Sequence, residues 1–251
     1  MTDKATVSGF GLIVVGNEIL DGRRNDRHMT ACLELLEERN ISLAYTLFLP
    51  DEPKQLESQI RWAVDRPEPF FCCGGIGATP DDRTRACAAA AAGVELEMHA
   101  EGVDILKKRY GEKKATPPRL EMVRFPRGST LIPNPINQVP GFRLRDGYFL
   151  PGFPEMARPM MSWVLDTYYE VGAVTDTRTL FVRDCGEADL AEMMRDFIAS
   201  NPSVSFSSLP RMTKSGSILE LGIRGPGAAV EKAHGDMIAR LDVLGVNHHT
   251  S

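Results

Sequence analysis

Short apolar runs alternate with longer stretches, in which apolar residues recur every three or four positions, along the first part of the chain. The runs at 12–15, 41–49 and 70–73 predict buried β-strands. The stretches that follow them predict helices, with apolar faces at Met29, Leu33 and Leu36, then at Leu56, Ile60, Ala63 and Val64, then in the alanine-rich run 86–92. This order predicts a parallel sheet covered by helices on both faces.

The apolar pattern changes at about residue 172. Before that point, residues 100–110 predict a helix, 111–118 an exposed mobile link, 148–150 a strand and 156–169 a closing helix. After it, the order βαββα predicts a small antiparallel layer, with apolar positions Leu180, Val182, Leu190, Met194, Phe197, Ile198, 204–206, 218–223, Val230, Ala233, Met237 and Leu241.

We therefore expect an α/β protein with two domains. Residues 8–171 are predicted to form a three-layer αβα domain with a mostly parallel sheet. Residues 172–245 are predicted to form a small α+β domain, which we interpret as a packing or oligomerisation module, because it has no glycine-rich phosphate loop and no carboxylate pair.

The loop after the third predicted strand is the most informative segment of the chain. Gly74, Gly75 and Gly77 permit backbone conformations closed to other residues and let a ligand approach the main chain. N–H groups at the start of the following helix would then face an anion such as a phosphate. Asp81 and Asp82 repel a phosphate unless a cation lies between them, and Mg²⁺ prefers carboxylate, phosphate and water oxygens. The loop therefore predicts a site for a phosphate and a divalent cation.

Ligands bind beyond the carboxyl ends of the strands in a parallel sheet. This rule places residues 16–22, Asp51 and the loop 74–82 on one rim, although they are far apart in sequence.

Simpler explanations compete at several of these positions. A lone Asp before a helix is commonly its cap, with Pro80 placed for a turn, and Asp51 has the same alternative. Glu18 is equally explained as a solvated charge at a helix start. Thr79 and Thr84 either donate their hydroxyls to a phosphate or cap the helix.

Composition excludes several classes of function. The formal net charge of −5 argues against broad nucleic-acid binding, which needs a basic face. No apolar run approaches the roughly 20 residues of a membrane helix, and the N-terminus lacks a signal-peptide core, so we expect a cytoplasmic protein. The 5 cysteines have no Cys-x-x-Cys spacing, which argues against a disulfide framework or a zinc knot. His248 and His249 are expected in a mobile tail.

The glycine loop also carries a resemblance to a known family. Residues 74–84, Gly-Gly-Ile-Gly-Ala-Thr-Pro-Asp-Asp-Arg-Thr, resemble the signature Gly-Gly-x-Gly-x-Thr-x-Asp-Asp-x-Thr of the molybdopterin-binding domain family, which includes MoaB, MogA and the N-terminal part of CinA. Residues 16–22 with Asn25 resemble the opening segment of the CinA branch, and 151–156 resemble its Pro-Gly-Val-Pro-x-Glu-Met turn. Residues 185–190 stand in place of its Gly-x-Gly-Glu-Ser-x-Leu segment.

A further turn of the family has a departure in this chain. Residues 133–141 resemble the family's Asn-x-x-Gly-x-Ala-Pro-Gly turn, with Asn137 in the place of glycine. Because Asn tolerates left-handed backbone better than other non-glycine residues, we expect the turn to be kept.

The resemblance implies a phosphate-binding site and its residues. Asp82 and Asp51 are the candidate catalytic residues, and Asp82, Asp81 and Asp51 the candidate metal ligands. The candidate ligand-binding residues are Gly74, Gly75, Gly77, Thr79, Asn17, Glu18, Asn25, Asn137 and Glu155.

Three functions are consistent with the resemblance. The first is divalent-cation-dependent hydrolysis of a pyrophosphate in an ADP-ribose-like nucleotide, with Mg²⁺ as the expected cation. The second is binding of molybdopterin, or of a related pterin or nucleotide, without chemistry, and the third is adenylyl transfer to molybdopterin as in MogA-like relatives. Family members are dimers or trimers, so self-association is expected. The amidase-like domain that CinA proteins commonly carry is not expected here, because the chain ends before it could begin.

Overall fold

The computed structural model of the chain describes residues 4–213 and 216–250. The chain divides into two compact units between Gly172 and Ala173, next to the position at which the apolar pattern changes. We call them the first unit and the second unit. Among the described helices, none combines the length and apolar content that crossing a membrane would require.

The first unit is built on a six-stranded sheet with the order β2-β1-β3-β8-β7-β6. Its parallel strands are β1 (Gly9–Val15), β2 (Ser42–Leu49), β3 (Phe70–Cys73) and β8 (Gly147–Leu150). The strands β7 (Gly141–Leu144) and β6 (Thr130–Ile132) extend the sheet in antiparallel fashion. The mostly parallel α/β sheet is thus confirmed. The antiparallel edge is an addition, because its short strands lie in a segment rich in Pro, Asn and Gly.

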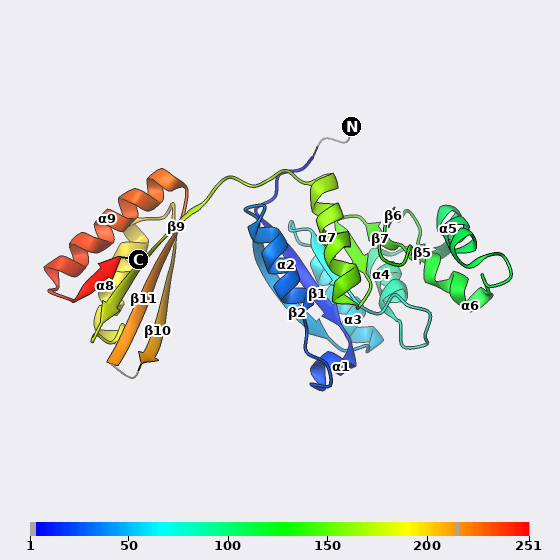
Figure 1. Cartoon of the computed structure of the whole chain (residues 1–251), viewed down its shortest axis with the longest axis horizontal. Helices are drawn as coiled ribbons and strands as arrows, with labels where there is room; N and C mark the ends of the chain where they lie inside the picture. The colour runs from blue at the N-terminus through cyan, green and yellow to red at the C-terminus, as the bar shows by residue number, and fades with distance from the viewer. Residues whose placement is uncertain (1–3, 214–215, 251) are drawn as a thin grey trace. The chain divides into compact units, whose positions relative to one another are not determined.

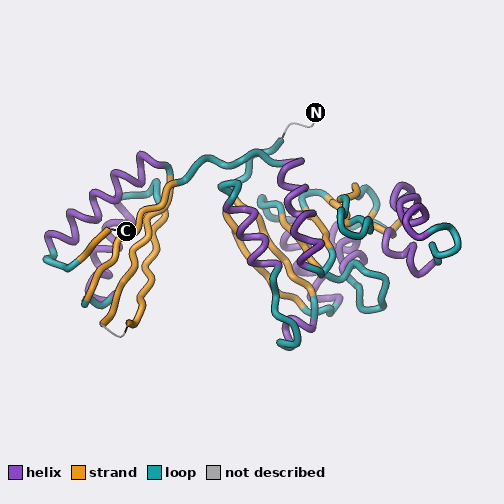
Figure 2. Tube along the Cα trace, viewed as in Figure 1, coloured by secondary structure: helices purple, strands orange, loops and turns teal. Residues whose placement is uncertain are grey.

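Helices cover both faces of this sheet (Figures 1 and 2). The helices α2 (His28–Glu37) and α7 (Pro154–Tyr168) pack on one face, and α3 (Pro53–Val64) and α4 (Thr84–Ala92) pack on the other. Alternate residues of β1 supply the two cores: Phe10, Leu12 and Val14 point to the first face, and Ile13 and Val15 to the second. The three-layer αβα arrangement follows from this alternation.

The buried face of α2 matches the predicted one at Leu36 but differs from it at the other two positions. Met29 is 38% exposed and Leu33 is 41% exposed, whereas Cys32, Leu35 and Leu36 pack into the core. Small buried residues such as Ala and Cys do not stand out in an apolar pattern, so the larger side chains on the outer flank were wrongly chosen. The predicted face of α3 is confirmed at Leu56, Ile60 and Ala63.

A small lobe is inserted between α4 and β6. It contains β4 (Leu96–Met98), α5 (Ala100–Tyr110), α6 (Pro117–Leu120), η1 (Glu121–Val123) and β5 (Arg124–Pro126). The predicted helix 100–110 is confirmed. The expected link 111–118 contains a turn and then begins α6.

The second unit is a four-stranded antiparallel sheet with the order β10-β11-β9-β12. Its elements are β9 (Asp176–Arg183), η2 (Glu187–Leu190), α8 (Ala191–Ser200), β10 (Ser205–Thr213), β11 (Gly216–Gly225), α9 (Gly227–Val243) and β12 (His248–Thr250). The small α+β layer is confirmed, and so is the predicted buried face of α9.

The C-terminal histidines are not in a mobile tail. His248 and His249 belong to β12, which pairs with β9 at Val182 and Phe181. The ring of His249 stacks on that of Phe181, with centroids 5.3 Å apart. Pairing with a distant strand is what orders this polar segment.

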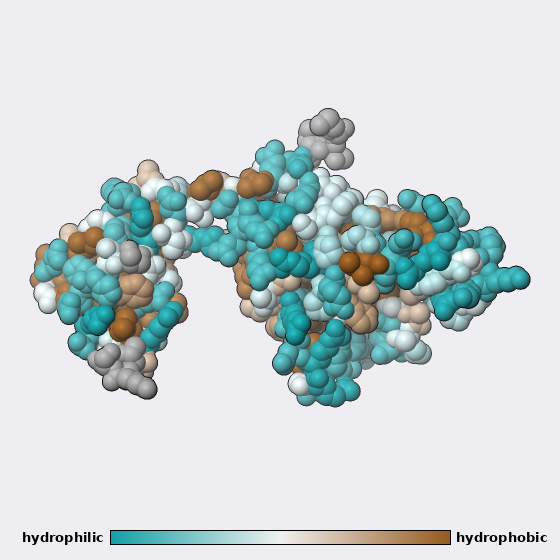
Figure 3. Space-filling model, in the orientation of Figure 1, coloured by the Kyte–Doolittle hydropathy of each residue, from teal (hydrophilic) through white to brown (hydrophobic). Residues whose placement is uncertain are grey.

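The surface is mixed in character. On the face that Figure 3 shows, apolar residues form separate areas among hydrophilic ones.

Candidate functional site

A pocket of about 420 Å³ lies where the parallel strands of the first unit end. Val15 ends β1, Asp51 follows β2, Gly74 follows β3 and Pro151 follows β8, and all four residues line the pocket. The other lining residues are Gly16, Glu18, Arg24, Gly75, Ile76, Gly77, Ala78, Thr79, Asp81, Asp82, Tyr110, Met122, Asn134, Asn137, Val139, Pro140, Gly152, Phe153 and Met156. The structure thus brings the expected rim segments together at one site.

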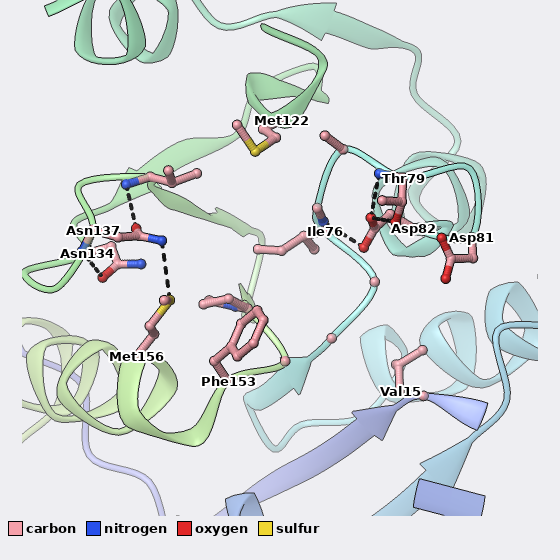
Figure 4. Close-up of a pocket in the computed structure, with 18 of the residues that line it drawn as sticks. Val15, Ile76, Thr79, Asp81, Asp82, Met122, Asn134, Asn137, Phe153 and Met156 are labelled. Atoms are coloured by element: carbon pink, nitrogen blue, oxygen red, sulfur yellow. Dashed lines mark hydrogen bonds between the residues drawn. The ribbon is translucent and has the colours of Figure 1, made fainter. Parts of the chain in front are cut away.

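The carboxylate of Asp82 holds the glycine loop in shape (Figure 4). Its Oδ1 accepts the N–H of Gly77 at 2.7 Å. Its Oδ2 accepts the N–H of Thr79 at 2.8 Å and the Thr79 hydroxyl at 2.5 Å. A Cβ on Gly77 would lie 2.6 Å from Asp82 Oδ2, so a side chain at this position would displace the carboxylate. Both oxygens of Asp82 are therefore engaged within the loop.

Two buried residues of α4 support the loop from behind. The Thr84 hydroxyl donates to the carbonyl of Gly74 at 2.8 Å, so it neither caps the helix nor faces the pocket. The Arg85 guanidinium donates to the carbonyls of Ile76 and Gly77. Because Thr84 is fully buried and Arg85 is 8% exposed, these bonds are shielded from water. The loop carbonyls are thereby held away from the ligand space.

Part of the loop backbone is left for a ligand. Among the hydrogen bonds of the described residues, the N–H groups of Gly75, Ile76 and Ala78 donate none. All three residues line the pocket. The start of α4, which we expected to face an anion, does not line this pocket, because Arg83, Arg85 and Ala86 line a neighbouring hollow. The loop, and not the helix end, carries the available donors.

Asp51 occupies the rim and is not a helix cap. The cap of α3 is Glu52, whose side chain accepts from Lys54 N and Gln55 N. Asp51 Oδ2 instead accepts the N–H of Asn17 at 3.0 Å. Of the two explanations that the sequence offers for Asp51, the helix cap is therefore excluded and the rim position is the one observed.

The rim carries a concentration of negative charge. Partial burial raises the pKa of Asp51, and the nearby carboxylates of Glu18, Asp81 and Asp82 raise it further, against the opposing hydrogen bond from Asn17. Within the described part of the chain, no group of three or more His, Cys, Asp or Glu residues is arranged to hold a metal by itself. A cation at this rim would need oxygens from a ligand as well.

The variant Asp51→Asn tests whether the charge of Asp51 destabilises the first unit. In the absence of divalent cations, this variant is expected to raise the midpoint of thermal unfolding of the first unit at neutral pH by up to about 2 °C. The folded-state pKa lies above the ordinary 3.8, so ionised Asp51 destabilises the native state at neutral pH, and the penalty disappears as the pH falls below that value. Tryptophan fluorescence reports on this unit alone, because both Trp residues, Trp62 and Trp163, lie in it. A lowered midpoint at neutral pH would contradict the argument.

The opposite wall of the pocket is apolar apart from the amides of Asn134 and Asn137. Its apolar residues are Tyr110, Met122, Val139, Phe153 and Met156, from the inserted lobe, the turn before β7 and the start of α7. Figure 4 shows Met122, Phe153 and Met156 among them. These residues were missed from the sequence. Single apolar residues in turns carry no periodic signal, although Phe153 lies within the turn 151–156 that the resemblance singles out.

Arg24 places a positive charge beside the apolar wall. Its guanidinium lies 5.5 Å from the centre of the Phe153 ring. Of the described residues that line the pocket, Arg24 alone carries a positive charge. Sequence reasoning did not identify it, because Arg24 is 129 residues from Phe153 and no local motif connects them.

The remaining candidates divide between the pocket and its surroundings. Asn137 and Glu18 line the pocket, whereas Asn17, Asn25 and Glu155 do not. Asn17 contributes its backbone N–H to Asp51. Asn25 and Glu155 are exposed.

In the turn at 133–141, a different residue from the expected one has a left-handed backbone. Gln138, at φ 61°, takes the left-handed conformation that we expected at Asn137. The Asn137 side chain lines the pocket, and its Oδ1 accepts the N–H of Val139 within the turn.

Known proteins resemble this chain in sequence and fold. Protein PAE0875 of Pyrobaculum aerophilum is 30% identical over 80% of this chain and 79% of its own length. A CinA-like protein of Sulfurihydrogenibium sp. is 30% identical over 74% of this chain, but the match covers only 48% of that longer protein.

A solved structure and a family match agree with these relatives. The protein CinA of Thermoplasma acidophilum, described as having unknown function, superposes with a TM-score of 0.59 at 25% identity, covering 64% of this chain and 98% of that one. Residues 11–170 match the family described as "Probable molybdopterin binding domain". Since this match spans more than half of the chain and contains the whole pocket, the protein belongs to the molybdopterin-binding domain family.

Proposed function

We propose that the pocket binds a nucleotide or pterin through its phosphates together with a divalent cation, Mg²⁺ in the first instance, and cleaves the pyrophosphate bond of an ADP-ribose-like ligand. The observation that supports this most directly is the division of one pocket into two halves. One half has loop N–H groups beside carboxylates, and the other has an apolar wall. A pyrophosphate-linked nucleotide has the same two parts, a charged diphosphate and a flat ring system.

The polar half suits the diphosphate. The N–H groups of Gly75, Ile76 and Ala78 supply donors, and Arg24 supplies a positive charge that can pair with phosphate oxygens. The carboxylates at the rim would repel the diphosphate in the absence of a cation. Ligand and cation are therefore proposed to bind together.

Two rim carboxylates are available for the cation. Asp51 bonds to Asn17 through Oδ2, which leaves Oδ1 for the cation. Asp81 is exposed at the loop. Asp82 has both oxygens engaged in the loop, so we assign it to positioning the loop and not to direct coordination. A divalent cation shared by Asp51, Asp81 and the diphosphate would neutralise charge at phosphorus and lower the barrier to attack by water.

The proposed reaction is a hydrolysis. The oxygen of a water molecule bonds to one phosphorus as the bond from that phosphorus to the bridging oxygen breaks, and the released protons pass to solvent. ADP-ribose would give AMP and ribose 5-phosphate. The loop donors and Arg24 hold the diphosphate in place while its charge redistributes.

The test is release of AMP from defined substrates. Purified protein is incubated with ADP-ribose, FAD or NAD and with Mg²⁺, Mn²⁺ or Co²⁺, and AMP is followed by chromatography. We expect AMP from ADP-ribose with a divalent cation and none in EDTA. Asp51→Asn is expected to slow turnover by at least about tenfold, since it removes a proposed ligand of the cation. Asp65→Asn, an exposed change at the far end of α3, is the matched control and is expected to leave turnover unchanged.

Other outcomes would identify other functions. Tight binding of nucleotides or pterins without hydrolysis would replace this proposal with a binding module. Transfer of an adenylyl group from ATP to a pterin phosphate would indicate the MogA-like reaction. Failure to bind any phosphate-bearing ligand would overturn the proposal as a whole. Self-association into a dimer or trimer stays a prediction, which light scattering tests.

A further inference from the structure

One buried amide in the pocket has donors without an acceptor. Asn134 is 4% exposed and lines the pocket. Its Oδ1 accepts the N–H of Ile136 at 3.0 Å and the N–H of Asn137 at 3.3 Å. Its Nδ2 is buried and has no hydrogen-bond partner among the described residues. Leaving a buried amide donor unpaired is energetically unfavourable, so this group calls for an explanation.

The neighbouring amide of Asn137 is poorly satisfied in the same way. Its Oδ1 accepts the N–H of Val139 at 2.8 Å, and its Nδ2 donates only to the thioether of Met156, with an N–S distance of 3.3 Å. A thioether is a weak acceptor. The wall therefore carries two adjacent amide groups whose NH₂ donors lack a strong acceptor.

The orientation of both amides is fixed by the backbone. Each carboxamide oxygen accepts one or two main-chain N–H groups, and exchanging oxygen with nitrogen would place donors against donors. The NH₂ groups must therefore be the ends that do not bond to the backbone of the turn. Figure 4 shows both of them on the side of the turn that faces Met156 and the pocket.

We infer that Asn134 and Asn137 select the ring system of the ligand. Two neighbouring donors match a ring edge that carries a carbonyl oxygen beside an unprotonated ring nitrogen. Guanine and hypoxanthine have such an edge at O6 and N7, and oxidised pterins and flavins have it at their 4-oxo group and N5. Adenine places an amino donor beside N7, which opposes one of the two amides. The inference rests on the proposed function, since the diphosphate must lie at the glycine loop for the ring to reach this wall.

The apolar wall supports a planar ring at this place. Met122, Val139, Phe153 and Met156 surround the two amides in the pocket lining. An aromatic ring and two thioethers can cover both faces of a bicyclic heterocycle while its edge meets the amides. Apolar surroundings also strengthen selection at the edge, because a mismatched polar group there loses its water without gaining a partner.

The inference is tested with ligands that differ only in the base. Calorimetry with Mg²⁺ would compare GDP, IDP and ADP, where IDP shares O6 and N7 with GDP but lacks its 2-amino group. We expect GDP and IDP to bind with similar affinity, and ADP to bind about tenfold more weakly or worse. The same order is expected for hydrolysis of the corresponding diphosphate sugars, so ADP-ribose would still be cleaved, but more slowly than its guanine counterpart. Equal affinity for all three would overturn the inference while leaving the proposed function intact, whereas no binding of any of them would count against the proposed function itself.

A variant that keeps the turn and inverts the contact makes the test specific. Asn134→Asp retains an oxygen for the N–H groups of Ile136 and Asn137 but replaces the donor with an acceptor. At mildly alkaline pH we expect it to lose at least about tenfold in affinity for GDP and IDP, and to lose the preference over ADP. Asn137→Asp is the second variant, with the same expected direction, in case the first does not fold. Unchanged base preference in a folded variant would overturn the inference.

The charge-matched control is Asn40→Asp. Asn40 lies in the turn before β2, at the opposite end of the strands from the pocket. The substitution adds the same negative charge to the first unit as Asn134→Asp does. Asp, like Asn, tolerates the left-handed backbone of residue 40. The variant is expected to keep the base preference of the unmodified protein, and a loss of preference in this control would show that the effect of Asn134→Asp comes from net charge.

Discussion

Replacing Asp82 with asparagine is expected to weaken binding of a phosphate-bearing ligand by roughly 30- to 150-fold. The carboxylate accepts three hydrogen bonds from Gly77 and Thr79, and an asparagine keeps only one accepting oxygen. Its NH₂ group would face donors of the loop, which costs about 2–3 kcal/mol. The loop N–H groups that we assign to phosphate then lose their arrangement. Calorimetry with GDP or ADP-ribose measures the effect.

The cation dependence of this loss separates two roles for Asp82. If Asp82 shapes the loop, the loss persists in EDTA, where any remaining affinity comes from the loop and Arg24. If Asp82 held the cation directly, the variant and the unmodified protein would bind equally in EDTA. Asp81→Asn is the matched control, because Asp81 is the neighbouring carboxylate and is exposed. It is expected to weaken binding only when the cation is present.

Gly74→Ala is expected to destabilise the first unit by about 3 kcal/mol or more, lowering its midpoint of unfolding by about 6–12 °C. Gly74 has φ 112°, a conformation that side chains rarely adopt, and a Cβ there would lie 2.2 Å from the carbonyl oxygen of Val15. That oxygen belongs to the backbone of β1, which is paired with β2 on one side and β3 on the other, and it cannot move aside cheaply. Tryptophan fluorescence during heating measures the change.

A glycine with open surroundings provides the comparison. Gly93 ends α4 with φ 71°, and a Cβ there would meet no atom within 4 Å. Gly93→Ala is expected to cost only about 1 kcal/mol, the strain of a left-handed non-glycine residue. Equal midpoints for the two variants would show that Gly74 is held by backbone conformation alone and that contact with β1 is unimportant.

Local patterns in the sequence were enough to predict the main architecture. The run Phe70–Cys73 is β3 without a change of boundary, because four consecutive apolar residues before a glycine suit a strand buried on both faces. Helix α3 was found from its apolar spacing. The position of the pocket also followed from sequence, since the order of strands and helices specifies at which end of a parallel sheet ligands bind.

Local patterns were misleading where a side chain takes its role from distant partners. Leu33 has helical spacing but lies on the outer flank of α2, because α2 packs against β1 and α7 through Cys32, Leu35 and Leu36. His248 and His249 are polar residues near the end of the chain, yet pairing with β9 makes them a strand. Residues that neighbour these positions in the sequence do not specify such packing or strand pairing.

The sequence by itself determined the parallel αβα fold, the glycine loop and the acidic residues beside it, because short-range periodicity and backbone freedom specify these. The tertiary structure alone decided what each of those residues does. It turned the carboxylate of Asp82 into the loop, released Asp51 from capping a helix, and brought Arg24, Asn134 and Phe153 to one pocket. The bonds of Asp82 and Asp51 depend on how the loops after the strands are folded, and the meeting of Arg24 with Asn134 and Phe153 depends on segments more than 100 residues apart in sequence, which come together only once the sheet has formed.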